Sequence, residues 1–309
     1  MTDNPLLTYS KAVTEAKQSN TPLVALESTI ITHGMPYPAN LETARAVEDI
    51  IRKGGATQAT IALMDGRIRI GLDDADLEQL AADKRAVKVS RRDMPVILAR
   101  KLTGATTVSA TMIAAEMAGI RIFVTGGIGG VHRGGETTMD ISADLRELSR
   151  TSVAVVSAGA KSILDIGLTL EYLETEGVPV LGWATEDFPA FYSRASGHKV
   201  NYRLDTPDDI ARVLYAKWQS GLSGGVLVAN PVPEAYAIPP DEVEQIVEEA
   251  MVKARQTGVK GKELTPFLLK TIGEQTGGRS LETNIALIKH NAKKGAGLAV
   301  AYRQLEIPS

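Results

Sequence analysis

One lysine occupies a position at which a side-chain amine could act as a nucleophile. Lys161 follows the apolar run Ser152–Val156 and the small-residue turn Ser157–Ala160. A helical pattern comes next, over Ser162–Leu168. An ammonium group near the positive end of a helix dipole is disfavoured, so the neutral amine is easier to reach. A neutral, positioned lysine attacks a carbonyl or an anomeric carbon and forms an imine.

A glycine-rich segment with an acidic end precedes this lysine. It runs from Gly126 to Asp144, and six glycines fall within its first ten positions. It follows an apolar run, so we expect its backbone to approach an anion. It leads into no helix after Gly130, and it matches neither the dinucleotide-binding fingerprint nor the phosphate loop of NTPases. Together with Lys161, it indicates an enzyme that acts on a phosphorylated sugar.

The acidic end of this segment is a candidate metal site. Asp140 and Asp144 are four residues apart, with Ser142 and Ala143 between them. If Asp140 begins a helix, the two carboxylates face the same way and suit a divalent cation that keeps several waters. Ordinary acidity at a helix start is an equally weighted alternative. His132 is a candidate substrate contact, although a loop histidine is more often simply solvated.

Two charged residues are associated with other apolar runs. Glu27 directly follows a candidate strand, and a carboxylate at the carboxyl end of a parallel strand is well placed for ligands. It is read either as a general acid or as a carboxylate that caps a loop. Lys88 lies between two valines, where pointing into solvent is the more common outcome. The following pair Arg91 and Arg92 forms either an anion site or a solvated turn.

Two helix starts supply further candidates. The segment Thr103–Thr111 is rich in small and hydroxyl residues, and free N–H groups at such a start bind phosphate. Ordinary capping by threonine or serine is the alternative. Near the C-terminus, Gly277–Ser280 opens a helix, and Asn284 would lie in its first turn with its amide directed inward.

Composition limits the class of protein. The 309 residues are 44% hydrophobic and 23% charged, and their net charge is −3. This balance gives no general attraction to nucleic acid or to anionic lipid. The chain has no cysteine, which excludes disulfides and thiolate metal sites and is compatible with a cytoplasmic location. The start, Met1–Pro5, does not resemble a signal peptide, and no apolar run is long enough to span a membrane.

Strand and helix patterns alternate along most of the chain. This alternation predicts a mostly parallel central sheet sandwiched by helices. The predicted strands are Pro22–Leu26, Ala59–Met64, Ala86–Val89, Ile120–Thr125, Ser152–Ser157, Val178–Trp183 and Gly225–Ala229. The predicted helices are Leu41–Lys53 with Asn40 as its cap, Met94–Leu102, Ser109–Ala118, Pro207–Ser220, Asp241–Gln256, Thr265–Gln275 and Leu281–Leu305.

Two regions depart from this alternation. Asp65-Gly66 separates two short apolar runs and predicts a β-hairpin. From Pro239 onward the pattern is helical. We expect these helices to pack back on the sheet, so that residues 1–309 form a single α/β/α domain; a separate helical domain is the less favoured alternative.

The set of motifs is more specific than any one of them. Six segments occur in this order: Leu26–Pro38, Val87–Asp93, Thr125–Gly134, Asp140–Leu145, Ala158–Asp165 and Ser280–Asn284. In this combination the chain closely resembles the pseudouridine-5′-phosphate glycosidase family, over nearly its whole length from Pro22 to Leu305.

The resemblance implies an activity and its residues. Enzymes of that family reversibly cleave the C–C glycosidic bond of pseudouridine 5′-phosphate to uracil and ribose 5-phosphate. They use a divalent metal, usually Mn²⁺, and assemble as homotrimers. Carried over by motif, the resemblance makes Lys161 the nucleophile, Glu27 the proton donor and Asp140 the metal ligand. The substrate-binding positions it implies are Lys88, Val108, Ser142, Ala143 and Asp144, together with His132 and Asn284.

The carbon-linked base explains why both an amine and an acid are needed. We hypothesise that Glu27 protonates the ribose ring oxygen while Lys161 attacks C1′, and that the ring-opened adduct then releases uracil and leaves an imine. Two competitors remain at this point. Another Schiff-base sugar-phosphate lyase, such as a class I aldolase, would need Lys161 but neither Glu27 nor a metal. A non-catalytic sugar-phosphate sensor would need no nucleophile.

Overall fold

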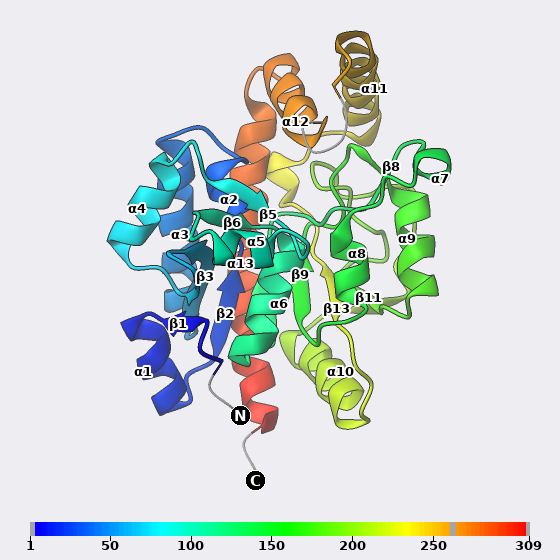
Figure 1. The fold of residues 1–309 in the computed structure, drawn as a ribbon. Coiled ribbons are helices and arrows are strands. Elements are labelled where there is room, and N and C mark those ends of the chain that lie inside the picture. The colour runs from blue at the N-terminus through cyan, green and yellow to red at the C-terminus, as the bar shows by residue number, and fades with distance from the viewer. Residues whose placement is uncertain (1–3, 260–263, 307–309) are drawn as a thin grey trace.

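The protein has three layers, in which helices cover both faces of one large sheet (Figure 1). This computed structural model describes residues 4–259 and 264–306. The architecture confirms the predicted fold class, a mostly parallel sheet sandwiched by helices.

The main sheet follows the order β1-β4-β3-β2-β7-β9-β13-β11-β12, with β5 and β6 branching from β3. All neighbours from β3 to β12 are parallel. Its strands are β1 (Leu7–Tyr9), β2 (Leu23–Leu26), β3 (Thr57–Met64), β4 (Arg67–Ile70), β5 (Val87–Val89), β6 (Gly104–Thr106), β7 (Ile122–Val124), β9 (Ala154–Ser157), β11 (Val180–Trp183), β12 (Tyr202–Leu204) and β13 (Val226–Ala229). A separate antiparallel pair joins β8 (Val131–His132) to β10 (Leu164–Asp165).

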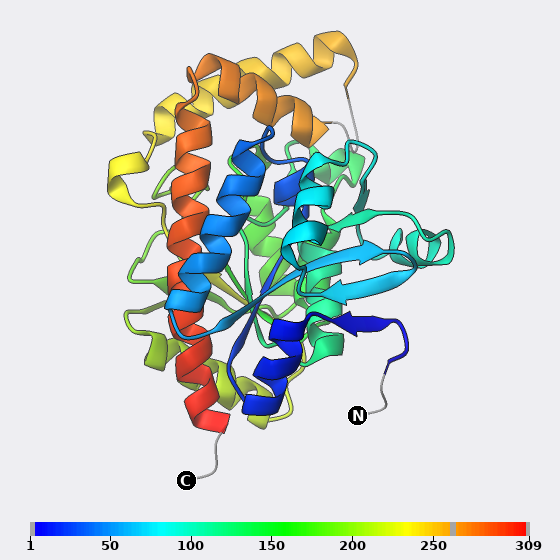
Figure 2. The ribbon, with the colours of Figure 1, turned by 90° about the vertical axis from the view of Figure 1, so that its left-hand side faces the viewer.

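Two groups of helices cover the two faces of the sheet. The first group is α3, α10 and α13, and Figure 2 shows α3 and α13 side by side. The second group is α6 and α8, which pack against each other. The helices are α1 (Lys11–Ser19), α2 (Thr29–Thr32), α3 (Ala39–Lys53), α4 (Asp74–Ala82), α5 (Met94–Ala99), α6 (Val108–Ala118), α7 (Gly135–Thr138), α8 (Ala143–Leu148), α9 (Ile166–Thr175), α10 (Pro207–Gln219), α11 (Pro240–Thr257), α12 (Leu264–Gln275) and α13 (Arg279–Glu306), with the 3₁₀ helix η1 (Glu234–Tyr236).

The central strands are buried on both faces, and this explains why their sequences are continuous apolar runs. Each residue of β7, β9, β11 and β13 is buried. Alternation of polar and apolar residues is the mark of a half-exposed antiparallel sheet, whereas doubly covered parallel strands lack it. Each of the seven predicted strands is present, with small shifts at its ends, although β5 is not fully buried.

The predicted hairpin is present. Strands β3 and β4 are antiparallel, and Met64 pairs with Arg67 across the turn. Asp65 and Gly66 both have positive φ, 53° and 75°. A two-residue turn with this conformation matches the twist of the flanking strands, which is why Asp-Gly signals it.

One helix cap was predicted wrongly, and one strand was missed. Asn40 does not cap a helix, because α3 already begins at Ala39 and the Asn40 amide donates to the carbonyls of Ile31 and Ala81. The segment Thr103–Thr111 contains β6 ahead of the start of α6, and the Thr107 hydroxyl caps that helix by accepting from the N–H of Ala110, which confirms the capping alternative. No strand was predicted there, since three small residues carry little strand signal.

The C-terminal helices differ in how they contact the sheet. Helix α13 runs along the sheet between α3 and α10, and its Leu287, Ala292 and Leu298 belong to the main hydrophobic cluster. Helices α11 and α12 pack on each other at the end of the molecule opposite the chain termini (Figure 1). Among the described residues, no helix is long and apolar enough to span a membrane.

One buried carboxyl makes stability depend on pH. Glu48 of α3 is 6% exposed and accepts a hydrogen bond of 2.6 Å from Thr60. Burial raises the pKa of Glu48, although Thr60 and the charge of Arg52 oppose the rise. A carboxyl whose pKa is higher in the folded state contributes stability below its unfolded pKa and loses it as pH rises through the folded pKa.

We therefore expect the free energy of unfolding of Glu48→Gln, relative to that of the wild type, to be higher at pH 7 than at pH 4. Glutamine keeps the acceptor for Thr60 and never carries the buried charge. Urea unfolding of both proteins at the two pH values measures the difference. A difference in unfolding free energy that does not change with pH would contradict this account.

Candidate active site

A pocket opens where β2 and β7 end. These strands are parallel neighbours, and the chain winds away from them in opposite directions, toward β3 on one side and toward β9 on the other. Crevices at such switch points are where open α/β sheets bind ligands. The pocket is lined by Glu27, Thr29, Ile30, His33, Gly34, Lys88, Gly126, Gly127, Lys161, Phe191, Leu269 and Asn284.

Four of the site residues predicted from the sequence meet in this pocket: Glu27, Lys88, Lys161 and Asn284. They come from the end of β2, from β5, from the turn after β9 and from α13, and they are far apart in the sequence. The other predicted residues do not line it: Val108, His132, Asp140, Ser142, Ala143 and Asp144.

The carboxylate of Glu27 is held between two threonines. Glu27 is 7% exposed, and its Oε1 and Oε2 accept hydrogen bonds from the hydroxyls of Thr125 and Thr29 respectively. A hydroxyl both donates and accepts, so either threonine can rotate to accept a hydrogen bond from a protonated Glu27. The carboxyl group therefore has a partner in both of its protonation states.

A buried amide on α13 fixes one of these threonines. Asn291 is fully buried, and its Nδ2 donates to the carbonyl of Thr125 at 2.8 Å. Its Oδ1 accepts from Asn230, which follows β13, at 2.8 Å. A buried amide is stable only when its groups are paired, and here the pairing joins α13 to the ends of two strands.

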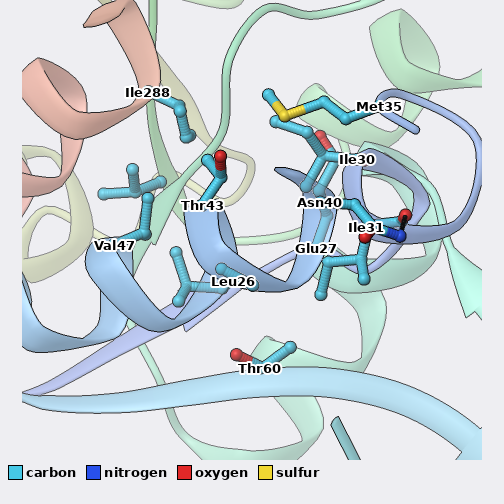
Figure 3. A pocket seen from close by; sticks show the side chains of 12 residues that line it. Leu26, Glu27, Ile30, Ile31, Met35, Asn40, Thr43, Val47, Thr60 and Ile288 are labelled. Atoms are coloured by element: carbon cyan, nitrogen blue, oxygen red, sulfur yellow. Dashed lines mark hydrogen bonds between the residues drawn. The ribbon is translucent and has the colours of Figure 1, made fainter. Parts of the chain in front are cut away.

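An apolar hollow lies behind Glu27. Figure 3 shows side chains around it that include Leu26, Val47 and Ile288. Its volume is about 30 Å³, room for one or two waters, and the side chain of Asn40 in its wall already has protein partners. The rear of Glu27 therefore faces hydrocarbon, and the carboxyl group is accessible from the pocket side.

The turn that carries Lys161 is fixed through its backbone. The Lys161 N–H donates to the carbonyl of Ile128 at 3.1 Å, and its carbonyl accepts from Leu164 at 3.0 Å. The predicted helix directly after Lys161 is wrong: α9 begins only at Ile166, with Asp165 as its cap. The reason is that Leu164 and Asp165 pair with β8 instead. The dipole of a helix that begins at Lys161 therefore cannot be used to explain a neutral amine at this position.

Lys161 has no ion pair among residues 4–259 and 264–306. An amine bound to a carboxylate would have to break that contact before it could act as a nucleophile. Its place in the pocket beside Glu27 is therefore compatible with attack on a ligand.

Positive charge surrounds the two histidines near the site. Burial and the charge of Lys88 lower the pKa of His33. Burial also lowers the pKa of His132, and Lys88 and Lys161 add to this effect, whereas Asp140 opposes it. His132 thus lies within electrostatic reach of both pocket lysines and of Asp140. The pocket lining contains two lysines, Lys88 and Lys161, and one carboxylate, Glu27, so it can offer positive charge to an anionic ligand.

The glycine-rich segment is used mainly for close packing. A β-carbon at Gly129 would lie 2.2 Å from Ser142 Oγ, and one at Gly127 would lie 2.5 Å from the ring of Phe191. The N–H of Gly129 donates to Asp144, so it is not available to an anion. Gly126 and Gly127, by contrast, line the pocket, and their N–H groups donate to no described residue.

Asp140 and Asp144 do not share a helix face, contrary to the prediction. Helix α8 begins at Ala143 with Ser142 as its cap, because the Ser142 hydroxyl accepts from the N–H of Asp144. The Asp144 carboxylate accepts from the N–H groups of Ser109 at 2.9 Å and Gly129 at 2.8 Å. Asp144 therefore joins the start of α6 to the glycine-rich segment.

Asp140 offers a single carboxylate to a metal. It is half-buried, and its side chain accepts no hydrogen bond from the described residues. Among residues 4–259 and 264–306, no group of three or more His, Asp or Glu side chains is arranged to hold a metal ion. These residues fit a hard cation bound by one protein carboxylate, with water and substrate oxygens as its other ligands.

The pair Arg91 and Arg92 does not form an anion site. Arg91 makes two hydrogen bonds of 2.7 Å to Glu147, which is 2% exposed. Arg92 lies 3.8 Å from Asp93. The bidentate contact occupies the Arg91 guanidinium, and it raises the pKa of Arg91.

Several pocket residues were not predicted as site residues. Thr29 and His33 belong to the quoted motif after β2, so a signal was present for them. Phe191 and Leu269 carry no local signal, because only the tertiary fold brings the loop after β11 and helix α12 to the pocket. Asn284 has a buried Oδ1 with no hydrogen-bond partner in the described structure, which is an acceptor ready for a ligand N–H group.

The two aspartates give a matched test of this geometry. We expect Asp144→Asn to lower the free energy of unfolding by about 1–3 kcal/mol, because an amide nitrogen replaces one of two acceptors that backbone N–H groups require. Asp140→Asn is expected to leave the free energy of unfolding unchanged, because the Asp140 carboxylate has no such bonds. Urea denaturation measures both. Equal effects of the two substitutions would contradict the assignment of Asp144 as the structural carboxylate.

The chain was compared with known proteins. Residues 12–301 match the family model described as Indigoidine synthase A like protein. A protein of Alkaliphilus metalliredigens (strain QYMF) named pseudouridine-5′-phosphate glycosidase is 58% identical over 97% of each chain. One of the same name from Cupriavidus pinatubonensis (strain JMP 134 / LMG 1197) is 60% identical, over 96% of this chain and 95% of that protein.

Solved structures agree with these relatives. The prealnumycin C-glycosynthase AlnA in complex with ribulose 5-phosphate superimposes with a TM-score of 0.91 and 39% identity, over 98% of this chain and 99% of that one. An indigoidine synthase A-like protein from Thermotoga maritima gives a TM-score of 0.88 and 37% identity, over 96% and 97% of the two chains. Sequence, fold and pocket thus point the same way, and the chain belongs to the pseudouridine-5′-phosphate glycosidase family.

Proposed function

We propose that this protein reversibly cleaves the C–C glycosidic bond of pseudouridine 5′-phosphate, giving uracil and ribose 5-phosphate. The names of the relatives support this activity, as does the sugar phosphate named in the AlnA complex. The observation that carries it in this chain is the meeting of Lys161 and Glu27 in one pocket at the sheet's switch point.

The two residues divide the chemistry. Glu27 gives a proton to the ribose ring oxygen while Lys161 Nζ bonds to C1′, and the bond between C1′ and the ring oxygen breaks. The lysine nitrogen then forms a double bond to C1′ as the C–C bond breaks. C5 of uracil accepts the proton that the nitrogen releases. Water hydrolyses the imine to ribose 5-phosphate and restores Lys161.

The uncharged end of the pocket suits the base. Uracil alternates carbonyl acceptors with N–H donors around its ring. Asn284 offers an unpaired acceptor, and Gly126 and Gly127 offer backbone N–H groups with no acceptor in the described structure. A ligand that satisfies both kinds of group recovers the cost of leaving buried polar atoms unpaired. Lys88 provides positive charge for the phosphate.

A divalent cation, Mn²⁺ by family resemblance, belongs to this proposal. Asp140 would hold it, and when bound it would supply positive charge to substrate oxygens near His132. A homotrimeric assembly and a cytoplasmic location belong to the proposal on the same resemblance.

Lys161→Ala is expected to lower uracil release from pseudouridine 5′-phosphate by at least about 10⁴-fold, because the proposed reaction passes through an imine on Lys161. The substitution removes no ion pair among the described residues, so folding should survive. Lys199→Ala is the matched control, since Lys199 is an exposed lysine paired with Asp187. Uracil release is followed by chromatography. Substantial turnover by the Lys161 variant would contradict the proposed role.

Removal of the metal is expected to lower activity without unfolding the chain. Asp140→Asn should weaken Mn²⁺ binding by about tenfold or more, because it removes the carboxylate that we propose as the metal ligand. Glu136→Gln, at an exposed carboxylate of α7, is the control. Electron paramagnetic resonance of free Mn²⁺ measures binding, and circular dichroism measures folding. Equal Mn²⁺ affinity of the Asp140 variant and the wild type would remove Asp140 from the account.

A further inference from the structure

Phe191 combines a strained backbone with a buried position in the pocket. Its φ is 58°, in the left-handed region that a bulky residue rarely adopts. Its side chain is 3% exposed and lines the pocket beside Lys161 and Asn284. Strain of this kind costs free energy and persists only where the surroundings impose it.

The backbone around Phe191 holds the turn of the nucleophile. The Phe191 N–H donates to the carbonyl of Ala158 at 2.8 Å, and Ser162 Oγ donates to the carbonyl of Ala190 at 2.5 Å. These contacts lie on either side of Lys161 in the sequence. They are made by backbone atoms of the loop, so a change of the Phe191 side chain leaves their partners in place.

The ring of Phe191 has a different neighbourhood. It covers Gly127, where an added β-carbon would lie 2.5 Å from a ring carbon. A β-carbon at Gly126 would lie 3.4 Å from the same ring and 3.5 Å from Asn284 Oδ1. The ring and the unpaired acceptor of Asn284 therefore converge on the glycine pair. Tyr192 packs edge-on against the ring at 4.8 Å between centroids and supports it.

This part of the pocket contrasts with the part that carries charge. Phe191 and the glycine pair bring no charged side chain, whereas Lys88 influences both His33 and His132. A phosphate requires the cationic part. The planar, uncharged fragment of a ligand is then left for the part bounded by the ring and the Asn284 amide.

We propose that the Phe191 side chain is the wall of the aglycone subsite and determines which base fits beside Asn284. The inference rests on the proposed function and deepens it, because it assigns uracil recognition to this wall and not to the sugar-phosphate side. The backbone of the loop around Phe191 positions Lys161, and the Phe191 ring bounds the space for a small planar base.

The test separates base binding from imine formation. Phe191→Gly removes the ring and relieves the left-handed strain, and Phe191→Leu is a second variant that keeps a side chain. Phe188→Leu is the matched control, because Phe188 is a buried aromatic of the same loop that does not line the pocket. Two quantities are measured: the uracil concentration for half-maximal synthesis with ribose 5-phosphate, and the rate of borohydride trapping by ribose 5-phosphate alone.

Both Phe191 variants are expected to need about tenfold more uracil or greater, with the rate of trapping unchanged. The control should alter neither quantity. Trapping that falls as far as synthesis would overturn the inference, because the ring would then act through the turn of Lys161. An unchanged uracil requirement would overturn it as well. If the wild-type protein is trapped with ribose 5-phosphate but never joins it to uracil, the proposed function is refuted. In that case uracil is also not the ligand of this subsite.

Discussion

The site depends on one constraint of topology: β2 and β7 are parallel neighbours from which the chain winds away in opposite directions. Glu27 follows the first strand and Thr125 the second, so the carboxylate and the hydroxyl meet at the edge where the two strands end. Asn291 of α13 holds Thr125 from the other side. A helix packed on the sheet thereby contributes to the orientation of a candidate catalytic acid, in addition to its burial of apolar surface.

The amine and the acid are held by different means. Glu27 has hydrogen-bond partners for both oxygens and an apolar hollow behind it, so its position is fixed through its side chain. Lys161 is fixed through its backbone, and its amine forms no ion pair within the described residues. This difference suits their proposed roles. An acid that transfers a proton needs a constant direction, whereas a nucleophile must follow its carbon from sugar to imine.

The sequence predicted the sheet well because doubly buried strands are continuous apolar runs, a signal that needs no tertiary information. Motif resemblance identified Glu27, Lys88, Lys161 and Asn284, which meet in one pocket. The helix expected after Lys161 failed because Leu164 and Asp165 pair with β8, a strand of two residues that has no periodicity to detect. Asp144 looked like a metal ligand, yet backbone N–H groups from two distant segments occupy its carboxylate. Phe191 was missed because its role depends on contact with Gly127, which only the fold creates.

The central claim is that the nitrogen of Lys161 bonds to C1′ of a phosphorylated pentose. Its most direct test is to reduce the protein with borohydride in the presence of ribose 5-phosphate and to locate the added mass by peptide mass spectrometry. The account predicts one sugar phosphate per chain, attached to Lys161 through a stable secondary amine. Attachment to another lysine, or a protein that gains no mass while it still releases uracil, would contradict it.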